Sequence, residues 1–182
     1  ERVKKLSLHG ITKDGWNRFK TNGNWEYDIV EMGYKYNLTD YAASFGLWQL
    51  RQINEWQRRR LEIVNKYNGG LSHIESISLP NINDGHAKHL FVIRLNLEQW
   101  SISRNSFIDK MNKRGIGLAV HYKPLHQLSY YKKKYNFKFD NFKIANSLYD
   151  SIISLPIYPN LSDRSLNYII ESITHLHNTY SK

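Results

Sequence analysis

The sequence predicts an α/β chain in which a long helix leads into a small α+β domain with a mostly antiparallel sheet packed by helices. Apolar residues recur at helical spacing over residues 39–67. Two later stretches, HIESISLP at 73–80 and HLFVIRL at 89–95, are typical of strands. Helical patterns with serine caps then start near Ser103 and Ser162. Residues 1–38, 39–70 and 71–182 are therefore predicted to form an extended segment, a long helix and a compact α+β domain.

The long helix has a start signal and a stop signal. Thr39 and Asp40 are suited to capping its first turn. Asn68, Gly69 and Gly70 readily adopt the left-handed conformation that ends helices, so the helix is expected to stop there. Before it, residues 1–38 are rich in Gly, Asn and aromatic residues without sustained periodicity, which predicts an extended or looped segment.

The rest of the α+β domain follows from the same kinds of signal. Glycine after a helical pattern and proline around apolar residues mark the ends of the elements. The predicted elements are a helix from Ser103 to Gly115, a buried strand over 115–120, a helix around Ile144 to Ile152, a rigid extended connection over 154–159, and a last helix from Ser162 or Asp163. The sheet is expected to have about three strands.

Composition limits the class of protein. The chain has 182 residues, 41% of them hydrophobic, and no apolar run approaches the roughly 20 residues of a membrane-spanning helix. With no cysteine it forms neither a disulfide nor a thiolate metal site, which fits a reducing cytoplasm. We therefore expect a cytoplasmic protein without a membrane partner.

The net charge of +10 raises the question of an anionic partner. Basic residues cluster only in the run Arg58 to Arg60 and in YYKKKYNFKF at 130–139, where aromatic residues alternate with lysines. Solvated faces explain both clusters, so a nucleic-acid partner is not expected. A non-catalytic basic module that binds an anionic polymer through Lys132 to Lys134 remains the alternative function.

Polar rings gather at the end of the predicted strand over 115–120. His121, Tyr122 and His126 lie around Pro124, which restricts the backbone. Loops at strand ends present polar groups over a scaffold, and neutral imidazole and phenol groups suit the hydroxyl and phosphate groups of a ligand. Packing inside the protein is the alternative role for His126.

Four blocks in order carry a family resemblance. They are HG at 9–10, YDIVEMGYKYNLTDYAASFGLWQL at 27–50, GIGLAVHYKPLHQLSYY at 115–131 and SLPIYPNLS at 154–162. Together they resemble the C-terminal half of the DegT/DnrJ/StrS family of sugar aminotransferases. The resemblance implies the C-terminal domain of a type I fold dependent on pyridoxal 5'-phosphate. It also implies a homodimer that transfers an amino group from glutamate to a nucleotide-linked keto sugar, for polysaccharide or glycan biosynthesis.

The resemblance assigns expected roles to five residues. Residues 1–38 correspond to the end of the large cofactor-binding domain, where Lys35 and Asn37 are expected to contact the cofactor phosphate in the partner subunit. Many family members carry Asn and Arg at these two positions, and a lysine ammonium is a suitable point charge for a phosphate. His121, Tyr122 and His126 are expected to line the substrate entrance.

Catalytic groups are not expected in this chain. In the family the lysine that holds the cofactor covalently lies upstream in a Ser- and Gly-rich motif, and no lysine here has that setting. The chain alone is therefore predicted to be inactive. No metal site is predicted either, because Asp84, His86 and His89 supply too few ligands for a closed site.

Overall fold

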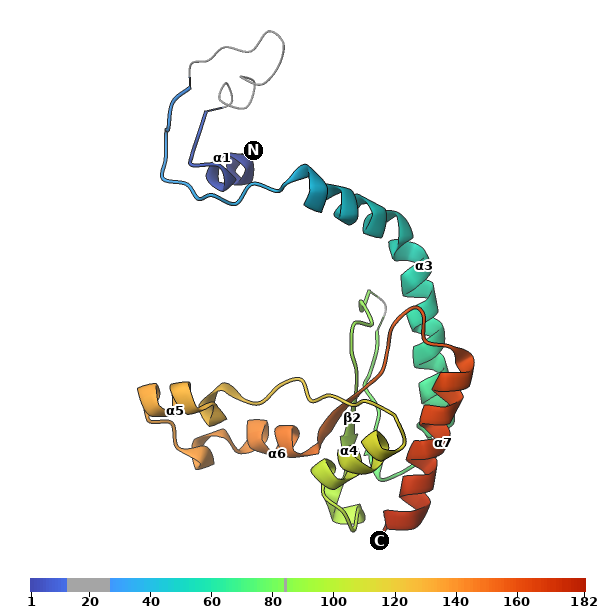
Figure 1. The fold of residues 1–182 in the computed structure, drawn as a ribbon. Helices are drawn as coiled ribbons and strands as arrows, with labels where there is room; N and C mark the ends of the chain where they lie inside the picture. The colour runs from blue at the N-terminus through green and yellow to red at the C-terminus, as the bar shows by residue number, and fades with distance from the viewer. Residues whose placement is uncertain (13–26, 84) are drawn as a thin grey trace. The chain divides into compact units, whose positions relative to one another are not determined.

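The computed structural model describes residues 1–12, 27–83 and 85–182, which group into two compact units, Glu1–Gln52 and Ile53–Lys182 (Figure 1). Helix α3 (Asp40–Leu71) contributes its first part to one unit and its second part to the other. The division falls within α3, whereas the sequence places boundaries after residues 38 and 70. Among the described residues, no helix has the length and apolar character needed to cross a bilayer.

The first unit joins two chain segments through backbone hydrogen bonds. Helix α1 (Arg2–Ser7) leads into residues 8–12, and residues 28–36 run antiparallel to residues 7–12. Leu8 pairs with Lys35, and Ile11 pairs with Ile29. The expectation that residues 1–38 are wholly extended or looped is therefore wrong for α1, whose six residues make fewer than two turns and are too few to show a periodicity.

Two glycines allow the segments of the first unit to approach closely. Gly10 has a φ of +78°, and a Cβ there would overlap the carbonyl group of Glu31. A Cβ at Gly33 would overlap the backbone of His9 and Gly10. Any larger residue would force the two backbones apart, so the contact requires glycine at both positions.

The second unit is built on an antiparallel sheet in the order β1-β2-β3. Strands β1 (Ile77–Ser78) and β3 (Ile152–Leu155) pair on either side of β2 (Phe91–Leu95). Phe91 pairs with Leu155 and Ile93 with Ile153, so these buried side chains share one face. Val92, Arg94, Ile152 and Ser154 alternate with them and lie on the other face.

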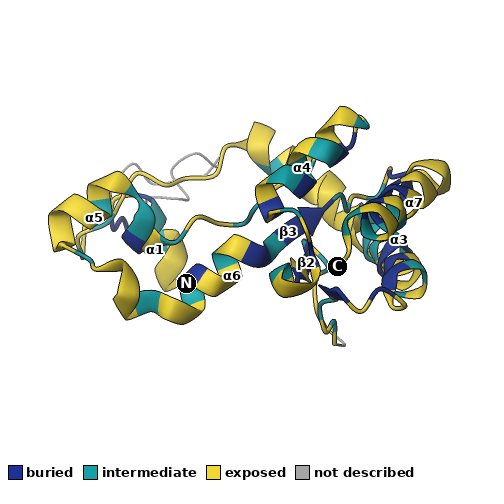
Figure 2. Ribbon diagram, turned by 90° about the horizontal axis from the view of Figure 1, so that it is seen from below, coloured by how far each residue is buried: buried dark blue, intermediate teal, exposed yellow. Residues whose placement is uncertain are grey.

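Helices cover the apolar face of the sheet. They are the second part of α3, helix α4 (Arg104–Lys113) and helix α7 (Asp163–Tyr180). The core contains Ile63, Val64, Tyr67, Leu71, Phe107, Met111, Leu166, Ile169, Ile173 and Leu176 from these helices. Figure 2 shows buried residues on β2 and β3, whereas α5 (Ser129–Tyr135) is largely exposed.

Helix caps follow the sequence prediction closely. The Ser103 side chain accepts a hydrogen bond from the backbone of Ser106 at the start of α4, and Ser162 accepts one from Ser165 at the start of α7. Gly115, with a φ of +76°, follows the end of α4. These ends are set by side chains within one turn, which is why they can be read locally.

Helix α3 passes through the glycines that were expected to end it. Gly69 and Gly70 are helical, and α3 ends at Leu71. A Cβ on Gly70 would lie 2.7 Å from Cγ2 of Ile170 on α7, so the glycine permits close helix packing instead of a left-handed turn. The tertiary contact with α7 overrides the local stop signal.

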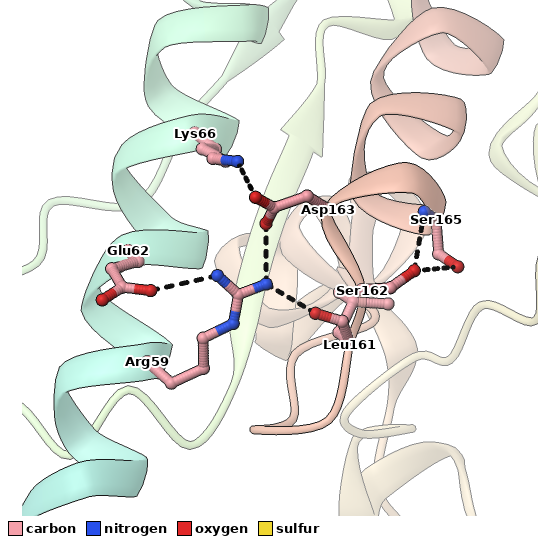
Figure 3. A network of polar contacts seen from close by, with 7 residues as sticks. All are labelled: Arg59, Glu62, Lys66, Leu161, Ser162, Asp163 and Ser165. Carbon is pink, nitrogen blue, oxygen red and sulfur yellow. Dashed lines mark hydrogen bonds and ion pairs between the residues drawn. The ribbon is translucent and has the colours of Figure 1, made fainter.

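Polar groups also join α3 to the start of α7. Arg59 donates to Glu62 at 3.0 Å, to the Leu161 carbonyl at 2.6 Å and to Asp163 at 2.8 Å, and Lys66 contacts the second Asp163 oxygen at 2.6 Å (Figure 3). The Lys66 ammonium and then the Arg59 guanidinium lower the pKa of Asp163 below its usual range. Nearby, the buried Tyr67 hydroxyl donates to the Pro156 carbonyl at 2.8 Å, and burial raises its pKa.

The remaining elements lie between β2 and β3 in the sequence. They are η1 (Leu97–Gln99), η2 (Leu125–Gln127), η3 (Phe139–Phe142) and α6 (Lys143–Ser151). Residues 115–120 do not form the predicted strand, since only Ala119 pairs, through an isolated bridge to Ser154. The third strand is instead β3, within the stretch expected to be a helix end and an extended connection.

Candidate functional site

The predicted polar segment begins where the chain leaves α4 and reaches β3. Ile116 is buried, and Ala119 exchanges backbone hydrogen bonds with Ser154 at 2.8 and 3.4 Å. This single β-bridge between Ala119 and Ser154 brings residue 121 next to the sheet, although residues 115–120 form no regular strand. The segment from His121 to Gln127 therefore starts at β3.

His121 is held by the sheet. Its Nδ1 atom lies 2.7 Å from the Ser154 hydroxyl, and Ser154 is itself buried. Because Ser154 alternates with Ile153 and Leu155 along β3, its side chain lies on the face of the sheet opposite the apolar core. His121 thus binds the sheet on its polar face.

The two residues after His121 are exposed. The Tyr122 side chain is 73% exposed and packs edge-on against the His121 ring, with centroids 4.8 Å apart. Lys123 is also exposed. The phenol of Tyr122 and the ammonium group of Lys123 can each donate hydrogen bonds to hydroxyl or phosphate oxygens.

His126 lies inside the protein. Its Nε2 atom is 2.6 Å from Oδ1 of Asn146 on α6, and its ring stacks on Phe142 with centroids 4.2 Å apart. Its 6% exposure favours the packing role over direct contact with a ligand. The structure thus brings His121 and Tyr122 together and places His126 in a separate buried contact.

Lys35 and Asn37 lie in the first unit. Both are exposed, and the backbone of Lys35 pairs with Leu8. The flanking Tyr34 and Tyr36 rings stack with centroids 5.0 Å apart. The bridge fixes the backbone while leaving an ammonium and an amide as donors, which fits the chemistry needed to hold a phosphate.

The lysine-rich stretch forms the exposed helix α5. Lys132, Lys133 and Lys134 are exposed, and the Lys134 ammonium lies 5.5 Å from the centroids of both Tyr130 and Tyr135. Within residues 1–12, 27–83 and 85–182, no group of three His, Asp or Glu side chains is placed to hold a metal ion. Asp84, named with His86 and His89 above, lies outside the described residues.

Two residues of this region were not predicted. Asn146 contacts His126 and Gln127, and Ser154 contacts His121. For both residues the only signal in the sequence is a polar residue within an otherwise apolar pattern. This signal is not distinctive until the hydrogen-bond partners are known. Only the folded structure identifies these hydrogen-bond partners, because they are distant in the sequence.

A hollow of about 1060 Å³ lies elsewhere in the second unit. It is lined by Gly115, Tyr158, Leu161, Arg164 and Tyr168, among other residues. None of the five predicted site residues lines it.

Two curated relatives match almost the whole of this chain, and one of them has a name that refers to polysaccharide biosynthesis. The Bacillus subtilis spore coat polysaccharide biosynthesis protein SpsC is 35% identical over 176 residues, which are 95% of this chain and 45% of SpsC. The Methanocaldococcus jannaschii protein MJ1066, named as uncharacterized, is 38% identical over 175 residues and again matches over 45% of its length. The chain therefore spans about half the length of the curated relatives it matches.

Solved structures show the same fold. The PMP form of Spr1654 from Streptococcus pneumoniae, titled as a sugar aminotransferase, has a TM-score of 0.82 at 36% identity and covers 97% of this chain and 44% of its own. Helicobacter pylori PseC, an aminotransferase of pseudoaminic acid biosynthesis, has a TM-score of 0.82 at 24% identity over 98% of this chain and 46% of its own. A family model matches residues 1–174. The chain belongs to the DegT/DnrJ/EryC1/StrS aminotransferase family.

Proposed function

We propose that this chain is the C-terminal part of an aminotransferase that uses pyridoxal 5'-phosphate to transfer an amino group from glutamate to a nucleotide-linked keto sugar. The observation that carries the proposal is the family match over residues 1–174, together with similarity to Spr1654 in both PMP and PLP forms. The enzyme works as a cytoplasmic homodimer and supplies amino sugars for polysaccharide or glycan biosynthesis.

In this proposal the first unit binds the cofactor phosphate in the partner subunit. When bound, pyridoxal phosphate supplies the electron sink that transamination requires. The Lys35 ammonium donates to a phosphate oxygen, and the Asn37 amide donates a second hydrogen bond. The exposure of both side chains and the backbone bridge at Lys35 support this role.

The second unit contributes to the substrate entrance. The Tyr122 hydroxyl donates to the sugar nucleotide, and the His121 ring borders the same place while Ser154 holds its Nδ1 atom. His126 supports the segment from the inside. Because no lysine of the sequence has the setting of the covalent cofactor lysine, we expect the 182-residue chain alone to be inactive.

Variants in the full-length enzyme test the two roles. Lys35→Ala should weaken cofactor binding by on the order of 1.5–3 kcal/mol, because it removes one charge-assisted contact. Lys4→Ala, which removes another exposed lysine of the first unit, is the matched control. Cofactor affinity is measured by the visible absorbance. A loss no larger than the control's would contradict the phosphate role.

Tyr122→Phe should leave the cofactor bound and raise the Michaelis constant for the sugar nucleotide. Mixing this variant with Lys35→Ala tests the shared site. If Lys35 completes the partner's site, heterodimers concentrate both defects in one site and recover part of the activity in the other. No recovery after confirmed subunit exchange would contradict the assignment of Lys35 to the partner subunit.

A further inference from the structure

A buried amide ties together three parts of the second unit. Asn146, on α6, is 5% exposed. Its Nδ2 donates to the Phe139 carbonyl at 2.8 Å, and its Oδ1 accepts from Nε2 of Gln127 at 2.8 Å and faces Nε2 of His126 at 2.6 Å. Phe139 belongs to η3, and the other two partners belong to η2. One side chain therefore holds the chain both before and after the exposed helix α5.

These contacts determine which atoms of the Asn146 side chain donate hydrogen bonds and which accept them. The Phe139 carbonyl only accepts, so the Asn146 NH₂ group must face it and Oδ1 must face the other two partners. His126 then has to donate through Nε2, which selects the Nε2–H form of its neutral ring. Aspartate keeps the acceptor but loses the donor, and leucine, of similar size, has neither.

A second contact holds the other end of the same segment. The Ser154 hydroxyl lies 2.7 Å from Nδ1 of His121. Asn146 and Ser154 belong to consecutive elements, α6 and β3, so one stretch of chain holds both ends of residues 121–127. The 73% exposed Tyr122 lies between the two anchors.

We infer that Asn146 is a positioning residue, which holds residues 121–127 on α6 so that Tyr122 presents its hydroxyl in a defined place. The role in presenting Tyr122 to the sugar nucleotide rests on the proposed function. The clamp, by which we mean the hydrogen bonds of Asn146 with His126, Gln127 and Phe139, does not rest on it. These contacts all lie within the second unit. Loss of a buried hydrogen-bonding partner weakens this attachment locally, while the apolar core of α3, α4 and α7 is untouched.

Amide hydrogen exchange in the 182-residue chain tests the clamp. Asn146→Leu should speed exchange at the backbone amides of residues 125–128 about tenfold or more and leave α4 and α7 unchanged. Ser147→Ala is the matched control, because its hydroxyl lies on the same helix but contacts Arg94. Asn146→Asp should restore only part of the protection, because its carboxylate still accepts from His126 but has no donor for the Phe139 carbonyl. Unchanged exchange at 125–128, or equal acceleration throughout α4 and α7, would overturn the inference.

A measurement on the unmodified chain covers the case in which Asn146→Leu does not fold. Nitrogen NMR of the neutral His126 ring should show the Nε2–H form. The Nδ1–H form would overturn the inference, because Asn146 could not then accept from Nε2.

Kinetics of the full-length enzyme separate the clamp from the proposed function. Asn146→Leu should raise the Michaelis constant for the sugar nucleotide more than it lowers kcat, and Asn146→Asp should recover part of the difference. If exchange increases at 125–128 but the Michaelis constant does not change, the clamp stands and the proposed substrate role of residues 121–126 is wrong. If neither changes, the clamp is wrong.

Discussion

Different interactions stabilise the two units of this chain internally. The second unit, Ile53–Lys182, encloses an apolar core with Phe107, Ile93 and Ile153 fully buried. The first unit, Glu1–Gln52, relies on backbone hydrogen bonds and two close glycine contacts, and most of its described large apolar residues are exposed. The second unit therefore has the features of an independent domain, whereas the first has the features of a segment that completes a larger surface.

A core substitution gives the largest expected effect. Phe107→Ala should lower the free energy of unfolding of the second unit by about 3–5 kcal/mol, because it leaves a cavity beside Trp100, whose ring lies 5.3 Å away. Leu47→Ala, at a 57% exposed position of the first unit, should change this free energy of unfolding by less than about 0.5 kcal/mol. Urea unfolding measures both. Equal effects would show that the two units share one core.

The exposed face of the first unit should make the chain self-associate. Leu47 and Leu50 are 57% and 68% exposed, and exposed apolar patches of this kind are energetically unfavourable in water. Replacing both with Lys should shift the chain toward monomer in sedimentation velocity. Ile144→Lys, at an exposed site of α6, is the control. A monodisperse monomer before any substitution would contradict the prediction.

Loss of a helix cap should have a smaller effect within the second unit. Ser162→Ala removes the acceptor for the Ser165 backbone at the start of α7 and should cost about 1 kcal/mol of unfolding free energy. Ser181→Ala, at the other end of the same helix, is the control, because the contacts given for Ser181 are backbone contacts, to His177 and Trp100, which alanine keeps. A cost no greater than that of Ser181→Ala would mean that water replaces the cap without loss.

The smallest effect should be a pH dependence at the clasp of Arg59, Lys66 and Asp163. Because these cations lower the pKa of Asp163 in the folded state, its contribution is present at neutral pH and is lost as pH falls below the ordinary carboxylate pKa of about 4. Asp163→Asn should therefore reduce the urea midpoint at pH 7, and the reduction should become progressively smaller as the pH falls below about 4 toward 3. A constant difference across this range would contradict the ion-pair origin.

The sequence alone determined the features that depend on neighbours within a turn or two. The serine caps of α4 and α7, the periodicity of α3 and the small antiparallel sheet are confirmed, because each follows from local hydrogen bonding or from the spacing of apolar residues. The family was also recognisable from ordered blocks of sequence, and the family match confirms it. The roles of Lys35, Asn37, His121, Tyr122 and His126 stay predictions.

Tertiary structure decided what depends on residues far apart in the chain. Gly70 stays helical because Ile170 packs against it, and residues 152–155 form a strand because they pair antiparallel with β2. His126 lies inside because Asn146, twenty residues later, supplies its hydrogen-bond partner. A local sequence pattern does not reveal such a partner. The hydrogen bond stabilises the protein only when the fold buries both polar groups together.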